Sequence, residues 1–245
     1  LFGNIANAAS GLWQIKKQSF HFKLISRRKI SYAFKRYIDF PKFNLFPTLL
    51  SSAATVLPFL FINKFYSTET VGYLDLSRLV LSIPLVFISA TISQVFFQQT
   101  TEKKNHLLSI KKDMTDILYL LFAIIAIEAA VIFLWGPELF GFVFGSSYEL
   151  SGTFSKVLIL SFSLNFISST FSSVFITFEK IRMNSIWQII YFLAICSLGF
   201  FHHLSITDFL KLYVLIEAIM HIISFGMIYY IASAYEKKCK ANSVN

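Results

Sequence analysis

The chain has 245 residues, of which 56% are hydrophobic and only 14% are charged, and its mean hydropathy is +0.64. Soluble domains usually carry about 25% charged residues, so this composition excludes a water-soluble globular protein. The net charge is +9. Because the Lys and Arg residues lie in gaps between apolar runs, the excess indicates contact with a membrane surface rather than with nucleic acid.

Six apolar runs follow one another along the chain, and a membrane-spanning helix needs about 20 such residues. We therefore predict an all-α, polytopic membrane protein with a bundle of six transmembrane helices at 43–235. The predicted spans are 45–62, 71–97, 117–135, 153–178, 185–201 and 209–232. The other predicted segments are the end of a preceding transmembrane helix at 1–15, a basic amphipathic cytoplasmic linker at 16–42 and a basic cytoplasmic tail at 236–245. A chain that starts at Leu1 is expected to be a fragment.

The Lys and Arg residues favour alternate gaps between the spans. They concentrate in 16–42, 98–114, 179–184 and the tail, whereas 136–152 and 202–208 contain none. Basic residues collect on the cytoplasmic side of short loops, so both ends of the chain are predicted to face the cytoplasm. One interpretation of the aromatic and basic residues of the linker is that it lies on the anionic cytoplasmic leaflet. A plain loop that connects two bundles explains these residues equally well.

Three spans carry polar side chains at helical spacing. Polar residues at membrane depth are costly and usually face a bundle interior or a wet cavity. The stripe residues are Asp75, Arg78, Ser82, Ser89 and Ser93 in the second span, Ser161, Asn165, Ser168, Ser172 and Glu179 in the fourth, and Glu217, His221 and Ser224 in the sixth. We predict that a substrate contacts Arg78, Asp75, Ser82, Ser89, Ser93, Asn165, Ser168 and Ser172.

Arg78, Glu128 and Glu217 lie at a similar depth, roughly 10–14 Å from the outer ends of their spans. An arginine fork suits phosphate oxygens, so one interpretation is that Arg78 holds a phosphate-bearing headgroup. The other is that Arg78 forms an ion pair with Asp75, Glu128 or Glu217. Glu128, Glu217 and His221 are candidates for ion coupling, because histidine titrates near neutral pH. A hydrogen-bonded pair that packs two helices together explains Glu217 and His221 as well.

Enzymatic function has little support in the sequence. It shows no metal-ligand spacing and no nucleophile constellation, so we expect neither catalysis nor a metal or cofactor. Cys196 and Cys239 are read as ordinary thiols. Nucleic-acid binding has no support beyond net charge.

Several short segments resemble bacterial lipid-linked oligosaccharide flippases. The likeness is most specific at 36–44 (Arg-Tyr-Ile-Asp-Phe-Pro-Lys-Phe-Asn), which resembles the start of the seventh helix of these proteins. It continues through 57–58, 71–73, 77–84, 92–97, 135–140, 144–145, 151–152 and 178–180. These flippases are the O-antigen and capsular polysaccharide translocases of the multidrug/oligosaccharidyl-lipid/polysaccharide exporter superfamily.

The resemblance implies that this chain is the second six-helix half of a twelve-helix transporter in the bacterial cytoplasmic membrane. Such proteins move undecaprenyl-pyrophosphate-linked oligosaccharides to the outer leaflet by alternating access, and Arg78 matches a cationic position that holds the pyrophosphate. The expected partners are the lipid-linked oligosaccharide, anionic membrane lipids, the N-terminal six-helix half and the polysaccharide polymerase machinery. The alternatives are an ion-coupled multidrug or metabolite exporter of the same fold, a membrane enzyme, or a non-transporting membrane scaffold.

Overall fold

The computed structural model describes residues 26–28, 31–32, 34, 38 and 41–242. The predicted helix end at 1–15 and most of the predicted linker at 16–42 lie outside these residues. The chain divides after Lys42 into two units, and the second unit, Phe43–Asn245, contains the helical bundle.

Apart from short 3₁₀ and π-helical turns, the second unit consists of α-helices and their connections. The helices are α3 (Phe46–Phe65), α4 (Thr68–Asn105), α5 (Lys111–Phe144), α6 (Glu149–Thr170), α7 (Ser173–Thr177), α8 (Ile181–Cys196) and α9 (Ile206–Asn242), and the turns are η2 (Pro41–Leu45), η3 (Ser146–Tyr148) and η4 (Ser197–Phe201). Among the described residues, six helical segments are long and apolar enough to cross a membrane, with η3, α6 and α7 counted as one segment and α8 with η4 as another. The prediction of an all-α bundle with six membrane-spanning helices is confirmed.

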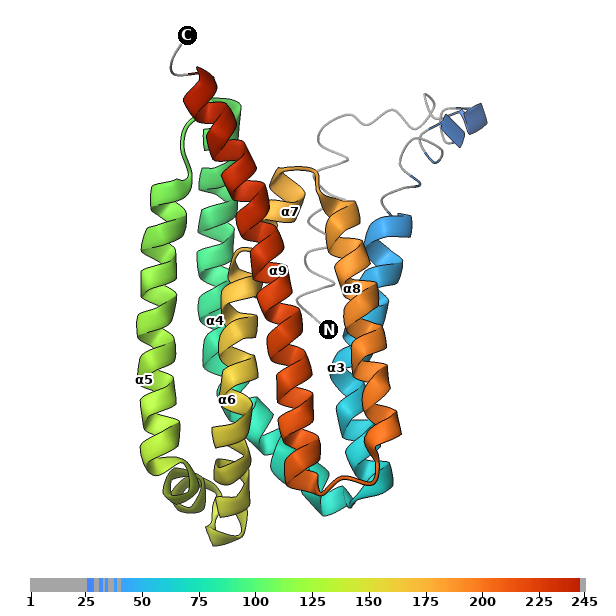
Figure 1. Ribbon diagram of the computed structural model, residues 1–245, viewed down its shortest axis with the longest axis vertical. Coiled ribbons are helices and arrows are strands. Elements are labelled where there is room, and N and C mark those ends of the chain that lie inside the picture. The colour runs from blue at the N-terminus through green and yellow to red at the C-terminus, as the bar shows by residue number, and fades with distance from the viewer. Residues whose placement is uncertain (1–25, 29–30, 33, 35–37, 39–40, 243–245) are drawn as a thin grey trace. The chain divides into compact units, whose positions relative to one another are not determined.

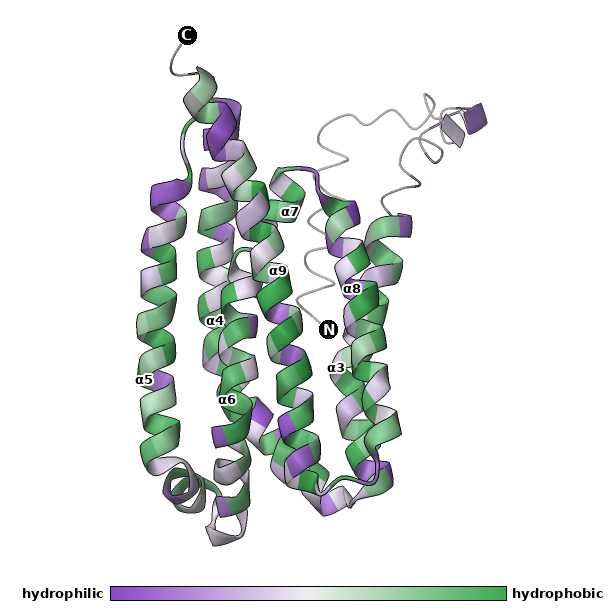
Figure 2. Cartoon of the chain, viewed as in Figure 1, coloured by the Kyte–Doolittle hydropathy of each residue, from purple (hydrophilic) through white to green (hydrophobic). Residues whose placement is uncertain are grey.

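Several helices run well beyond the predicted apolar spans. Helices α4, α5 and α9 have 38, 34 and 37 residues, which corresponds to roughly 50 Å or more against a hydrocarbon core of about 30 Å. Hydropathy detects only the part of a helix that lies in hydrocarbon. Figure 2 shows the hydrophilic residues gathered at the upper ends of α4, α5 and α9, where these helices continue.

Helix α6 lies at the centre of the bundle and packs against α4, α5 and α9, whereas α3 packs chiefly against α8 (Figure 1). In the most apolar stretch of the η3–α7 segment 61% of the residues are buried, whereas in the most apolar stretch of α5 only 11% are buried. The buried residues of α6 include Ser151, Ser155, Ser161, Ser163 and Ser168. Small side chains let the backbones of neighbouring helices approach each other closely, so the serine-rich sequence of α6 suits its central position.

The fourth predicted span is not one continuous helix, because α6 ends at Thr170 and α7 begins at Ser173. Hydroxyl groups bond to nearby backbone carbonyls at this break. Ser169 Oγ donates to the Phe166 carbonyl at 3.2 Å, and Ser172 Oγ donates to the Ser169 carbonyl at 2.7 Å. Such local bonds compete with the regular helical hydrogen bonds, and we attribute the interruption to them.

Two apolar cores hold the helices together, and they differ in which helices they join. The first core includes Ile62 of α3, Leu74 of α4, Ile195 of α8 and Phe209 of α9. The second core joins α4, α5, α6, α7 and α9, and among the described residues it receives nothing from α3 and only the partly buried Met183 from α8. The α3–α8 pair is therefore anchored to the bundle mainly through the first core, which lies towards the turns at 66–67 and 202–205.

Helices α5 and α6 touch through two glycines. A Cβ atom added to Gly152 would lie 2.5 Å from the backbone carbon and oxygen of Gly136 and 2.5 Å from the Cα of Pro137. Real Cβ atoms do not approach backbone this closely. Backbone cannot move aside as a flexible side chain can, so only glycine fits at this crossing.

We expect the substitution Gly152→Ala to destabilise the bundle by at least the ~1–3 kcal/mol typical of overpacking. In detergent the apparent Tm should fall by roughly 5 °C or more, which fluorescence-detected size-exclusion chromatography after heating can measure. Gly226→Ala is the matched control, because a Cβ at Gly226 would meet nothing within 4 Å. Equal Tm values for the two variants would show that the glycine contact is not limiting.

Candidate functional site

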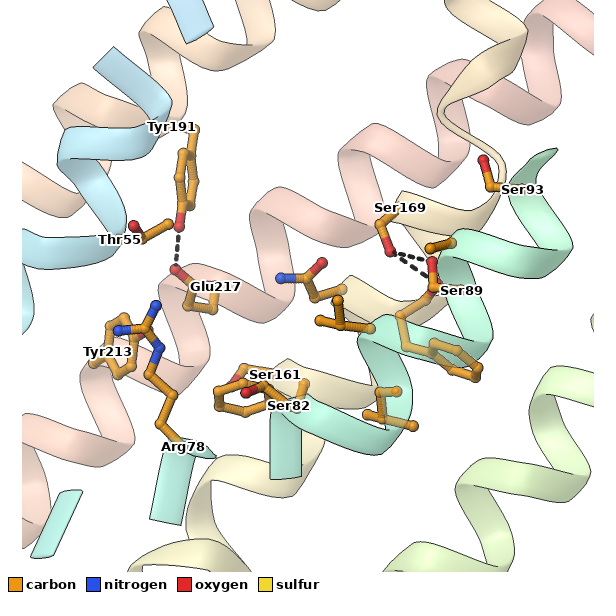
Figure 3. A pocket seen from close by; sticks show the side chains of 16 residues that line it. Thr55, Arg78, Ser82, Ser89, Ser93, Ser161, Ser169, Tyr191, Tyr213 and Glu217 are labelled. Carbon is orange, nitrogen blue, oxygen red and sulfur yellow. Dashed lines mark hydrogen bonds between the residues drawn. The ribbon is translucent and has the colours of Figure 1, made fainter. Parts of the chain in front are cut away.

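A cavity of about 440 Å³ lies between α3, α4, α6, α8 and α9, and most of the residues that line it are polar (Figure 3). Its polar and charged lining residues are Thr55, Arg78, Ser82, Ser89, Ser93, Ser161, Asn165, Ser169, Tyr191, Tyr213 and Glu217. From Arg78 to Ser93 the cavity follows α4 for about 22 Å at 1.5 Å per residue. Volumes of this order are typical of small-molecule sites, so the bundle contains space for a polar ligand at membrane depth.

Arg78 lies at one end of the cavity, where α4 faces α3 and α9. Its guanidinium carbon is 5.0 Å from the centre of the Phe59 ring on α3, a distance at which a cation interacts with an aromatic face. Figure 3 shows the guanidinium directed towards Tyr213 and Glu217 of α9. Within the described part of the chain Arg78 forms no ion pair within 4.0 Å, so its donors can take an incoming anion.

Beside Arg78, four buried polar side chains form a hydrogen-bonded chain across three helices. Tyr191 Oη of α8 donates to Glu217 Oε1 of α9 at 2.6 Å, and His221 Nε2 lies 3.1 Å from Glu217 Oε2. The other imidazole nitrogen of His221, Nδ1, lies 3.0 Å from Ser168 Oγ of α6. Each of these residues is at most 6% exposed. Buried polar groups that satisfy one another in this way fix helices in register.

The Tyr191 ring is held in place by Trp187, one turn earlier on α8. The two rings stack with centroids 5.4 Å apart and planes at 7°. The Trp187 indole nitrogen donates to the Met220 carbonyl at 2.8 Å. We had not predicted Tyr191 or Trp187 as site residues from sequence. Their i,i+4 spacing and polar tips in an otherwise apolar span are the signal that would have pointed to them.

Hydroxyl groups of α4 and α6 line the cavity from the neighbourhood of Arg78 to its far end, and we call Ser82, Ser89, Ser93, Ser161 and Ser169 the serine ladder. Ser89 Oγ and Ser169 Oγ lie 3.1 Å apart, and Thr170 Oγ1 donates to Ser89 Oγ at 3.0 Å. Figure 3 shows Ser82 and Ser161 close to Arg78, and Ser89, Ser93 and Ser169 at the opposite end. The cavity therefore has a charged end and a neutral polar end.

The structure brings together many of the residues that the stripes predicted. Arg78, Ser82, Ser89, Ser93, Asn165 and Glu217 line the cavity. Ser168 and His221 lie behind its wall, where they complete the hydrogen-bonded chain that includes Glu217.

Three predicted residues lie elsewhere. Asp75 and Ser172 are exposed and do not line the cavity. Asp75 is three residues from Arg78, which turns it about 60° around the helix. Glu128 is on α5, and its Oε2 is buried with no hydrogen-bond partner among the described residues. Glu128 and Arg78 are at a similar depth in the membrane, but Glu128 is not part of the Arg78 site, because α5 packs on α6 and does not contribute to the cavity.

Fold and cavity together define a multi-pass membrane protein with a polar site inside its helical bundle. A family model described as polysaccharide biosynthesis protein matches residues 10–152, more than half of the chain, and the chain belongs to this family. The matched region includes Arg78 and the serines of α4, and it ends before α8 and α9. No curated protein and no solved structure matches the chain.

Proposed function

We propose that the chain is the second six-helix half of a flippase that moves undecaprenyl-pyrophosphate-linked oligosaccharides across the bacterial cytoplasmic membrane. The observation that carries this proposal is the cavity with Arg78 at one end and the serine ladder leading away from it. Membership of a polysaccharide biosynthesis family supports it. A glycan pyrophosphate is polar and charged, and hydrocarbon offers it neither hydrogen bonds nor counter-charge.

In this proposal the pyrophosphate lies against Arg78, and the sugars lie along the serine ladder towards Ser93. The guanidinium offers paired donors to phosphate oxygens. Hydroxyl groups replace the water that the sugars lose. A carboxylate whose oxygens faced the pyrophosphate directly would repel it. In Glu217 one carboxylate oxygen accepts a hydrogen bond from Tyr191 and the other lies against His221, so both are shielded from the pyrophosphate. The lipid tail stays in the bilayer.

The way the α3–α8 pair is attached supports alternating access. The first core joins this pair to the other helices, and the second core almost omits it. In this proposal the pair rocks about the first core, and the cavity changes its width at the end near the loop 106–110. The basic loops predict that this end faces the cytoplasm. Rocking of one group of helices against another around a fixed site is the usual transporter motion.

Glu217 and His221 are our candidates for coupling flipping to a proton gradient. The groups that face Glu217 are Arg78 from α4, Tyr191 from α8, Tyr213 and His221 from α9, and the Ser168 hydroxyl of α6 at the far side of His221. A proton taken up by the Glu217–His221 pair changes the charge next to Arg78. Loading and release of an anion at Arg78 would then depend on protonation.

The proposal is tested by complementation. The chain, completed with its N-terminal half, is expressed in a bacterial strain that lacks its own lipid-linked oligosaccharide flippase, and surface polysaccharide is measured. We expect polysaccharide to return. Accumulation of the protein in the membrane without polysaccharide, together with resistance to toxic compounds, would favour the exporter of the same fold. Membrane accumulation with neither effect would favour the non-transporting scaffold.

A further inference from the structure

A second hollow, the α5–α9 groove, lies between the beginning of α5 and the end of α9. Its volume is about 330 Å³. It is lined by Ile110, Lys111, Met114, Thr115, Leu118, Phe225, Tyr229, Ala232, Ser233, Glu236 and Lys237. None of these residues lines the cavity that contains Arg78, so the groove is a separate feature.

The lining of the α5–α9 groove changes from charged to apolar along its length. Lys111 and Lys237 lie at the end formed by the helix termini, and Leu118 and Phe225 lie deeper. From Lys237 to Phe225 the groove follows α9 for about 18 Å. Tyr229 is 61% exposed within the groove lining, and tyrosine is enriched at membrane–water interfaces. A polar end followed by an apolar length is the order of parts in a phospholipid.

The one acidic residue of this lining already has partners. Glu236 Oε1 accepts from the backbone nitrogens of Ile110 and Lys111 at 2.7 and 3.0 Å, and Oε2 accepts from Ser109 Oγ at 2.9 Å. Glu236 therefore neutralises the positive N-terminus of α5. Lys111 and Lys237 are both exposed, and among the described residues neither forms an ion pair. The polar end of the groove is thus cationic.

We propose that the α5–α9 groove binds one anionic phospholipid from the surrounding bilayer. The lipid phosphate lies between Lys111 and Lys237, and one acyl chain covers Met114, Leu118 and Phe225. The apolar floor gives no advantage to a free phosphate, and the two ammonium groups select a net negative headgroup over a zwitterionic one. This site does not depend on the transport proposal, because it shares no residue with the Arg78 cavity.

The test is native mass spectrometry of the purified chain released from vesicles of phosphatidylcholine, with or without phosphatidylglycerol. We expect one retained phosphatidylglycerol and no retained phosphatidylcholine. The double variant Lys111→Gln/Lys237→Gln should bind phosphatidylglycerol roughly 30-fold more weakly, given the usual attraction per lysine at an anionic surface. The matched control is Lys112→Gln/Lys238→Gln, which removes the same charge from neighbouring lysines that do not line the groove.

A third variant, Leu118→Trp, keeps both lysines and fills the apolar floor, so it should also release the lipid. The proposal is overturned if the control double variant loses phosphatidylglycerol as strongly as the groove variant, because the attraction would then be a general surface charge. It is equally overturned if phosphatidylcholine is retained as well. Circular dichroism of each variant checks that the helices remain formed.

Discussion

Replacement of Arg78 by alanine should abolish flipping while the protein still inserts and accumulates in the membrane. A hydrogen bond to a charged group contributes about 1.5–3 kcal/mol, and a paired contact of the guanidinium with a pyrophosphate contains two. Their loss corresponds to a decrease of roughly 100-fold or more in transport rate. Arg78→Lys keeps the charge without the paired geometry, so its rate should fall between those of the parent and the alanine variant. The measurement is surface polysaccharide in the complemented strain at matched protein levels.

Arg182 provides a matched control for this experiment. Its guanidinium carbon lies 5.0 Å from the centre of the Phe43 ring, the same distance that separates Arg78 from the Phe59 ring. Arg182 does not line the cavity. Arg182→Ala therefore removes a comparable cation–aromatic contact and should leave most of the flipping. Normal polysaccharide in the Arg78→Ala and Arg78→Lys strains would show that Arg78 is a structural charge and that the headgroup lies elsewhere.

The fold was predictable because a membrane imposes a simple rule on sequence. Each spanning helix must supply about 20 apolar residues, and the six runs are separated by short polar gaps. What hydropathy could not predict is where α4, α5 and α9 end, since their charged terminal turns continue as helix outside the hydrocarbon. The break after Thr170 was also missed, because it results from serine hydroxyls and not from a proline or glycine.

The candidate site was partly predictable for a similar reason. Helical spacing fixes which side chains share a face, and this placed Arg78 and the serines of α4 together. Spacing says nothing about which helices are neighbours. It therefore grouped Glu128 with Arg78 on depth alone, although α5 does not reach the cavity, and it left out Tyr191, which α8 brings to Glu217.

Glu217→Gln should keep the fold and uncouple flipping from the proton gradient. The amide has nearly the shape of the carboxylate and can still accept the Tyr191 hydroxyl bond, so the helices should stay in register. It cannot take up a proton at neutral pH. In proteoliposomes that contain the complete transporter, an imposed pH gradient should accelerate flipping of a fluorescent lipid-linked oligosaccharide by the parent. The same gradient should have no effect on the variant. The rate of the variant should be about 100-fold or more below that of the parent, which is the lower end of the usual contribution of a positioned proton-transfer group.

Two further variants separate coupling from structure. Tyr191→Phe removes one donor to Glu217 and leaves the carboxylate. Its main cost is one hydrogen bond to a charged group, about 1.5–3 kcal/mol, and it should keep its response to the gradient. Asp75→Asn neutralises an exposed carboxylate one turn from Arg78 and outside the cavity, so it should behave like the parent. If Glu217→Gln responds to the gradient as the parent does, the chain of Tyr191, Glu217, His221 and Ser168 serves only to hold α8, α9 and α6 together, and the coupling ion must act at another site.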